Sequence, residues 1–194
     1  MTKNFAFIAW ALGIVAWYAI RYPFERRSKK SAVATSLVDR REWVILALLT
    51  VGLFILPAVY AVTGILAALD RTFYPPVAWL GVIAMLASLW LFQRSHKDLG
   101  RNWSASLKMR EQHQLVTGGV YRYVRHPMYS SFFLLALAQV LLIPNWLAGG
   151  AGLIAVLVLY LFRVAREEKM MADQFGDAYQ DYCARTARIV PWVL

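Results

Sequence analysis

The sequence has little charge and almost no cysteine. Only 16% of its 194 residues are charged, whereas a soluble domain carries about 25%. This shortage argues against an ordinary soluble domain. The single cysteine, Cys183, cannot form an internal disulfide or supply a cysteine-rich metal site. The sequence therefore carries no sign of an oxidising compartment.

Several functional motifs are missing as well. The sequence contains no P-loop, no nucleophile elbow and no Rossmann glycine fingerprint. The three histidines, His96, His113 and His126, lie far apart and lack the spacing of metal ligands. We therefore expect no bound metal ion.

Acidic residues are also scarce, with 11 acids against 21 lysines and arginines and a net charge of +10. A basic balance of this kind suits nucleic acid, anionic lipid or an anionic substrate. Because 60% of the residues are hydrophobic and no nucleic-acid-reading motif is present, we expect membrane lipids as partners and no nucleic acid.

Five apolar stretches dominate the rest of the chain. They cover residues 5–20, 43–69, 77–92, 132–143 and 146–162. A full membrane crossing needs about 20 apolar residues, so the second stretch is long enough, while the first, third and fifth are a few residues short. The fourth stretch is the weakest, even if it begins at Met128. The Pro144-Asn145 step predicts a tight hairpin between the last two stretches.

Basic residues concentrate in two of the connections between these stretches. Residues 21–42 contain seven lysines and arginines against three acids, and residues 93–127 contain seven against two. The positive-inside rule places such segments in the cytoplasm. Five transmembrane helices with the N-terminus outside satisfy the rule for both segments and for the C-terminal tail. The sequence thus predicts an all-α, multi-pass integral membrane protein.

The polar stretch from His113 to Tyr129, with the sequence HQLVTGGVYRYVRHPMY, leads directly into the fourth apolar stretch. Its Gly118-Gly119 pair predicts a sharp turn. Pro127 suits the first position of a helix, and the free N–H groups of that turn could hold a carboxylate or a ribose oxygen. The alternative is a plain helix start, with Arg125 and His126 solvated at the membrane interface.

A second polar group follows the fifth apolar stretch. Arg163 and Glu167 lie four residues apart and share one helix face. They could form a simple intrahelical salt bridge. Alternatively, Arg163 could pair with an anionic substrate group while Glu167 holds a polar or cationic part of a cofactor. Gly176 is expected to end this helix, and Asp177 to cap a last short one.

These motifs carry a resemblance to a known family. Residues 97–191 resemble the isoprenylcysteine carboxyl methyltransferase family, and especially its short prokaryotic members with five membrane helices. The matching pieces are HKDLG at His96, NWS at Asn102, HQLVTGGVY, RHPMY, the RxxxEE pattern at Arg163 and FGDAYQDY at Phe175. The wider superfamily also contains phospholipid N-methyltransferases, thiol methyltransferases and some sterol reductases.

The resemblance implies a cofactor and a set of site residues. The cofactor is S-adenosylmethionine, with S-adenosylhomocysteine as its product. Arg163 corresponds to the arginine that meets the substrate carboxylate. A further cofactor contact near Ser106 or Lys108 stays open. The implied cofactor-binding residues are His113, Gln114, Leu115, Val116, Tyr121, His126, Pro127, Met128, Tyr129 and Glu167.

The resemblance also implies two regions of the chain with different roles, and a reaction. Residues 1–92 would hold membrane helices 1–3, and residues 93–194 would form the methyltransferase region with a cytoplasmic cofactor pocket, in the inner membrane of a prokaryote. The leading reaction is O-methylation of a prenylcysteine-like or other lipophilic carboxylate that enters from the bilayer. The alternatives are an amine or thiol methyltransferase and, outside enzymes, a transporter subunit or scaffold. A transporter needs polar groups at mid-bilayer, and the apolar stretches contain almost none.

Overall fold

The computed structural model describes residues 1–28, 35–36, 39–100, 103, 108–109 and 114–193, without the side chains of 35–36 and 108–109. Helices form nearly all of this part of the chain, in agreement with the all-α prediction. The longer helices are α1 (Lys3–Ser28), α2 (Arg40–Thr50), α3 (Leu56–Thr63), α4 (Pro75–Leu99), α5 (Pro127–Leu142), α6 (Trp146–Phe175) and α7 (Asp177–Arg185). A π-helical turn, η1 (Val51–Ile55), joins α2 to α3, and the short 3-10 turns η2 (Ala67–Leu69) and η4 (Gly119–Arg122) lie in connections.

Single residues define where several of the helices begin. Asp39 caps α2 by accepting a hydrogen bond from the backbone N–H of Glu42 at 2.8 Å. Prolines occupy the first turns of α4 and α5, where the missing N–H carries no penalty. Asn145 caps α6 as the hairpin prediction requires. Gly176 ends α6 as predicted, but Asp177 is the first residue of α7 and Gly176 is its cap.

The π-helical turn lies directly before Pro57 and is contacted by a side chain from another helix. Pro57 lacks the N–H that the carbonyl oxygen of Gly52 would otherwise accept in a π-type bond. The side-chain amide of Gln139, from α5, donates to this oxygen at 2.9 Å instead. Gly52 also lets η1 approach α6 closely, because a Cβ there would lie 2.8 Å from the carbonyl oxygen of Ala151. The π-helical turn between α2 and α3 is therefore the point at which this helix packs against α5 and α6.

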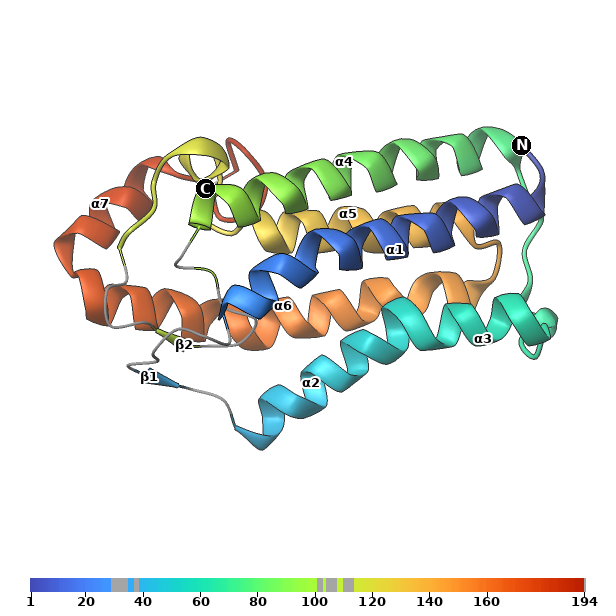
Figure 1. Cartoon of the computed structure of the whole chain (residues 1–194), viewed down its shortest axis with the longest axis horizontal. Coiled ribbons are helices and arrows are strands. Elements are labelled where there is room, and N and C mark those ends of the chain that lie inside the picture. Colours follow the sequence, from blue (N-terminus) through green and yellow to red (C-terminus); the bar gives the residue numbers. More distant parts are fainter. Residues whose placement is uncertain (29–34, 37–38, 101–102, 104–107, 110–113, 194) are drawn as a thin grey trace.

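The helices form an antiparallel bundle (Figure 1). Helix α4 packs against α1 and α5, while α2, η1 and α3 pack against α6. The rings of Trp17, Phe92 and Phe132 form an aromatic core between α1, α4 and α5, with centroid distances of 5.0–6.3 Å. Large apolar side chains remain exposed on the outer faces, as lipid contact requires.

Four helical segments are long and apolar enough to cross a membrane: α1, the continuous helix over residues 40–63, α4 and α6. The fifth predicted crossing corresponds to α5, a shorter apolar helix of 16 residues. At 1.5 Å per residue it is about 24 Å long, against a hydrocarbon core of about 30 Å. The crossing of the bilayer by α5 therefore stays a prediction.

The two ends of the bundle differ in what they contain (Figure 1). One end, here called the basic end, holds the last turns of α1, α4 and α6, the first turns of α2 and α5, and α7. A two-residue antiparallel pair, β1 (Thr35–Ser36) and β2 (Lys108–Met109), joins the two basic connections there. The other end, here called the short-loop end, holds the N-terminus and residues 64–74 and 143–145.

Candidate active site

A cavity of about 790 Å³ opens at the basic end. This volume lies within the range of about 300–1,000 Å³ that is typical of ligand sites. All ten predicted site residues that the structure describes line this one cavity: Gln114, Leu115, Val116, Tyr121, His126, Pro127, Met128, Tyr129, Arg163 and Glu167. The remaining one, His113, lies outside the described residues, as do Ser106 and the side chain of Lys108. The individual roles of these residues stay predictions.

The glycine pair forms the turn that the sequence predicts. Gly119 has a φ of +61°, in the left-handed region, and a Cβ there would lie 2.1 Å from Oδ2 of Asp98. The same carboxylate oxygen accepts a hydrogen bond from the backbone N–H of Val120 at 2.9 Å. Asp98 thereby fixes the turn that carries Tyr121, a buried cavity residue whose pKa is raised by desolvation.

The segment before α5 is buried, so the plain, solvated helix start is wrong for this site. The side chains of Arg125 and His126 are each only 9% exposed. Their backbone N–H groups donate to the carbonyl oxygens of Ala187 and Arg188 at 2.8 and 3.0 Å. The chain after α7 therefore runs beside the predicted cofactor-binding segment and holds it in place.

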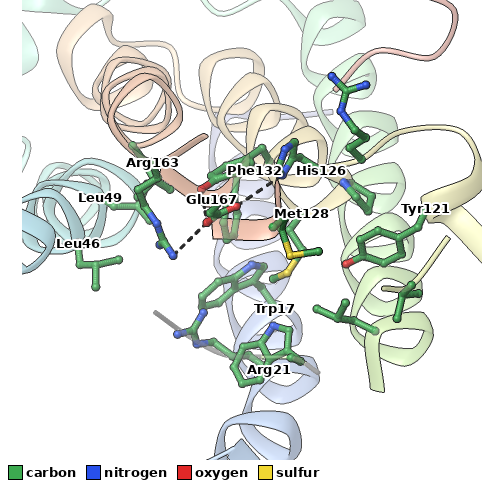
Figure 2. Close-up of a pocket in the computed structure, with 18 of the residues that line it drawn as sticks. Trp17, Arg21, Leu46, Leu49, Tyr121, His126, Met128, Phe132, Arg163 and Glu167 are labelled. Carbon is green, nitrogen blue, oxygen red and sulfur yellow. Dashed lines mark hydrogen bonds and ion pairs between the residues drawn. The ribbon is translucent and has the colours of Figure 1, made fainter. Parts of the chain in front are cut away.

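His126 lies between two consecutive glutamates, Glu167 and Glu168, and Figure 2 shows its contact with Glu167. Its Nδ1 is 3.5 Å from Oε2 of Glu167, and its Nε2 is 3.3 Å from Oε1 of Glu168. Burial opposes a charged imidazole, but the hydrogen bonds and charges of the two glutamates outweigh it, and the pKa of His126 is raised. Tyr129 donates a hydrogen bond to Oε1 of Glu167 at 2.7 Å. These contacts hold the Glu167 carboxylate at the cavity wall.

Arg163 is not half of a simple surface salt bridge. Its Nη2 is 3.3 Å from Oε1 of Glu167, as the four-residue spacing predicts, but the arginine side chain is only 10% exposed. Its Nη1 lies 3.5 Å from Oε1 of Glu42, a fully buried carboxylate in the first turn of α2. Sequence reasoning missed Glu42, because an acid at a helix start has an ordinary explanation in the helix dipole.

The other half of the cavity is mainly apolar, apart from Arg21 and Thr50, and comes from helices that the sequence did not assign to the site. The sequence predicts a pocket formed by the C-terminal half of the chain. In the structure, α1, α2 and η1 supply much of the cavity wall. Val15 and Tyr18 line the cavity and are still more than half exposed, so the cavity opens on the flank of the bundle. These apolar wall residues are Ile14, Val15, Tyr18, Leu46, Leu49 and Phe54.

The chain matches the model of a family described as isoprenylcysteine carboxyl methyltransferase over residues 79–173. It is 37% identical over 89 residues to a protein-S-isoprenylcysteine O-methyltransferase of Schizosaccharomyces pombe, covering 44% of this chain and 36% of that protein. A second such enzyme, form B of Arabidopsis thaliana, is 33% identical over 96 residues, covering 48% of this chain and 49% of that protein.

A methanethiol S-methyltransferase of Bradyrhizobium diazoefficiens is also similar, with 36% identity over 74 residues. That match covers 38% of this chain and 25% of the relative. The chain thus aligns with half or less of the length of these three relatives. The family match contains Arg163, Glu167 and the segment from Gln114 to Tyr129, while Glu42 and the α1 wall lie outside it.

Proposed function

Because the chain belongs to the isoprenylcysteine carboxyl methyltransferase family, we propose that it is a multi-pass membrane enzyme that methylates the carboxylate of a lipophilic acceptor. The methyl donor is S-adenosylmethionine, and the acceptor is a prenylcysteine or a compound of similar chemistry. The observation that carries the proposal is the two-part cavity, which joins a charged wall at the basic end to an apolar wall that opens on the flank of the bundle.

The charged part of the cavity fits the donor. Bound S-adenosylmethionine supplies a methyl group on a positively charged sulfur. Glu167, held by His126 and Tyr129, offers a carboxylate to the donor's cationic groups. The side chains of Gln114 to Val116, Tyr121 and Met128 surround the same space with polar and apolar surface. A buried tyrosine and a partly buried methionine next to a fixed carboxylate suit a ligand that is part adenosine and part amino acid.

The acceptor carboxylate needs alignment more than activation. It is anionic at neutral pH, so the site requires no general base. Arg163 faces the cavity and can hold a carboxylate with its planar guanidinium. Methyl transfer is then accelerated in two ways. The acceptor is aligned at a near-attack distance of about 3–3.5 Å, and the apolar walls exclude water. The lipid tail lies along the side chains of α1 and α2 and enters through the flank.

The same proposal includes a topology of five crossings with the basic end in the cytoplasm. The alternating direction of α1, the helix over residues 40–63, α4, α5 and α6 supports it (Figure 1). The water-soluble donor then reaches the cavity from the cytoplasm of a prokaryotic cell, and the acceptor reaches it from the inner membrane.

A glycosylation sequon tests this topology. Asn102-Trp103-Ser104 is such a sequon and follows α4. Asn102 lies outside the described residues, but the test requires only the side of the membrane on which it emerges. We expect no glycosylation of Asn102 in a eukaryotic expression host. Glycosylation there would place the basic end on the wrong side of the membrane.

A thiol acceptor is the second candidate, and the similarity to a methanethiol S-methyltransferase favours it. A thiol is mostly neutral near pH 7 and must lose its proton to become a nucleophile. Arg163 could stabilise the resulting thiolate. The product chemistry separates the two candidates, because methyl esters are cleaved by mild base, whereas methyl thioethers and methylated amines are stable to it.

The test is transfer of a radiolabelled methyl group by the protein purified in detergent. The acceptors are an S-prenylated cysteine with a free carboxylate, the same compound with its carboxylate as an amide, and a lipophilic thiol. We expect base-labile label on the first compound alone. Base-stable label would move the thiol or amine reaction to first place, and no label on any acceptor or lipid extract would contradict the enzymatic proposal.

A further inference from the structure

Two ion pairs connect the N-cap and the first turn of α2 to α6, just after the apolar stretch of α6. The inner pair is Glu42–Arg163, at 3.5 Å, and the outer pair is Asp39–Arg166, at 3.2 Å. Both acids and both arginines are three residues apart, so the pairs lie one helical turn from each other. The outer pair is exposed to solvent, whereas Glu42 is fully buried and Arg163 nearly so.

Glu42 is an unusual group to bury. Neither of its carboxylate oxygens has a hydrogen-bond partner among the described residues, and its one ionic contact is Arg163. Buried ion pairs contribute little net stability, because desolvation offsets the attraction. The outer pair and the Asp39 cap already fix the start of α2 against α6. Packing alone therefore gives little reason for a carboxylate at position 42.

The position of Glu42 relative to the cavity suggests another reason. Arg163 lines the cavity and lies between two carboxylates, Glu167 at the charged wall and Glu42 on the α2 side. Glu42 does not line the cavity itself. Its negative charge therefore acts on a bound acceptor through Arg163, by offsetting part of the charge of the guanidinium.

Methyl transfer to a carboxylate destroys charge. An acceptor oxygen forms a bond to the methyl carbon while the carbon–sulfur bond breaks and its electron pair returns to sulfur, so the negative carboxylate and the positive sulfonium both become neutral. A strong, unopposed arginine would bind the anionic acceptor more tightly than the less charged transition state. Binding of that kind lowers KM and also lowers kcat.

We propose that Glu42 is the counter-ion that limits how tightly Arg163 holds the acceptor carboxylate. It is a positioning residue, which acts through Arg163 and weakens ground-state binding while Arg163 still aligns the acceptor. The inference rests on the proposed carboxyl methylation. It extends that proposal to a residue of α2 that lies outside the segment matched to the family.

The test compares two acid-to-amide substitutions at the start of α2, one at the N-cap and one in the first turn. In Glu42→Gln the shape is kept and the buried charge is lost, so KM for the S-prenylated cysteine and kcat should both fall, each by about tenfold or about 1.4 kcal/mol. Asp39→Asn removes the outer pair but keeps a good helix cap, and should leave both constants unchanged. Glu42→Asp keeps the charge and should keep KM near the wild-type value.

A merely structural Glu42 predicts a different pattern, in which KM rises while kcat falls because Arg163 loses its orientation. That pattern, or unchanged constants in Glu42→Gln, overturns the proposal. A binding measurement that needs no turnover gives a second test. With S-adenosylhomocysteine present, an acceptor analogue with a sulfonate in place of the carboxylate should bind Glu42→Gln about tenfold more tightly than wild type, and equal or weaker binding contradicts the inference.

The proposed function and the role of Glu42 can be refuted separately. If the wild-type protein methylates no carboxylate, the proposed function fails and the role of Glu42 fails with it. If the wild type forms base-labile methyl ester and only the Glu42 variants depart from the expected pattern, the function stands and the counter-ion proposal alone is refuted.

Discussion

The two ends of the bundle differ in how their polar groups are paired, although the Nε of Arg71 at the short-loop end is also buried without a hydrogen-bond partner among the described residues. At the short-loop end, Asp70 accepts hydrogen bonds from Lys3 at 3.1 Å, from Asn145 at 2.8 Å and from Tyr60. The bond from Asn145, followed by those from Tyr60 and Lys3, holds the pKa of Asp70 below its usual value. Asn145 also caps α6 and donates to the carbonyl oxygen of Leu66 at 2.7 Å.

At the basic end, the charged groups line a cavity or lie directly behind its wall, and some of them are only partly paired. The Nε of Arg163 and both carboxylate oxygens of Glu42 are buried without a hydrogen-bond partner among the described residues. Such groups are unfavourable unless a ligand or a reaction uses them. We therefore expect the short-loop end to stabilise the fold and the basic end to bind ligands. Substitutions at the short-loop end should lower thermal stability, whereas substitutions at the basic end should lower ligand affinity or methyl transfer.

The largest effect is expected for Arg163→Ala. Methyl transfer should fall by about 30-fold or more, since the loss of one member of a desolvated charge pair costs about 2–5 kcal/mol, while the dissociation constant for S-adenosylhomocysteine should barely change. Arg163→Lys should restore little transfer, because an ammonium group cannot reproduce the planar fork. Normal transfer by Arg163→Ala would remove the main argument for a carboxylate acceptor.

Arg163→Ala also leaves Glu42 without its ionic partner, which should lower the unfolding temperature. The double variant Arg163→Ala with Glu42→Gln is the control for this effect. It should regain thermal stability without regaining methyl transfer, because the buried charge is gone and the acceptor still lacks its arginine. Recovery of transfer in the double variant would mean that Arg163 only stabilises the fold.

The next effect is expected at the short-loop end, for Asn145→Ala. The substitution removes the α6 cap and the hydrogen bonds to Asp70 and to the carbonyl oxygen of Leu66, which should cost about 2 kcal/mol of unfolding free energy and lower the thermal midpoint in detergent. Affinity for S-adenosylhomocysteine should stay at the wild-type value. A loss of affinity as large as the loss of stability would abolish the distinction between the two ends.

A smaller effect is expected for Glu167→Gln, which tests the charged wall of the cavity. Affinity for S-adenosylhomocysteine should fall about tenfold, because a hydrogen bond to a charged group contributes about 1.5–3 kcal/mol. The matched control is Asp173→Asn, which breaks the exposed pair with Lys169 on the same helix, at 3.6 Å. Calorimetry should show wild-type affinity for S-adenosylhomocysteine in the control. Equal affinities for both variants would mean that Glu167 does not bind the cofactor.

The smallest effect concerns pH and His126. Its folded-state pKa is raised above the ordinary value of 6.5 by Glu167 and Glu168. Its stabilising contribution is therefore fully present below pH 6.5 and is lost as the pH rises through the raised pKa. The difference in thermal midpoint between wild type and His126→Asn should be larger at about pH 6 than at about pH 9. A difference that grows with pH would contradict a protonated His126.

Much of the architecture could be predicted because it is local. Apolar runs of sufficient length, Pro127 and the Gly119 turn each carry their own signal, and the structure contains the corresponding elements. The predicted site residues from Gln114 to Tyr129 also belong to one short segment, so their common position in the cavity follows from chain continuity.

The missing parts depend on contacts between distant segments. Glu42 meets Arg163 only because α2 packs against α6, and the apolar wall from α1 requires the whole bundle. Nothing in the residues around Glu42 distinguishes it from an ordinary acid in a first helical turn. The burial of Arg125 and His126 similarly depends on the chain after α7, which lies beside them in space and far from them in sequence.

The central claim is that the cavity at the basic end binds S-adenosylmethionine. The most direct measurement is calorimetric titration of the purified protein in detergent with S-adenosylhomocysteine, run in parallel on wild type, Glu167→Gln and Asn145→Ala. We expect saturable binding at one site, weakened in Glu167→Gln and unchanged in Asn145→Ala. Absence of a signal for the folded wild-type protein at millimolar ligand would contradict this claim.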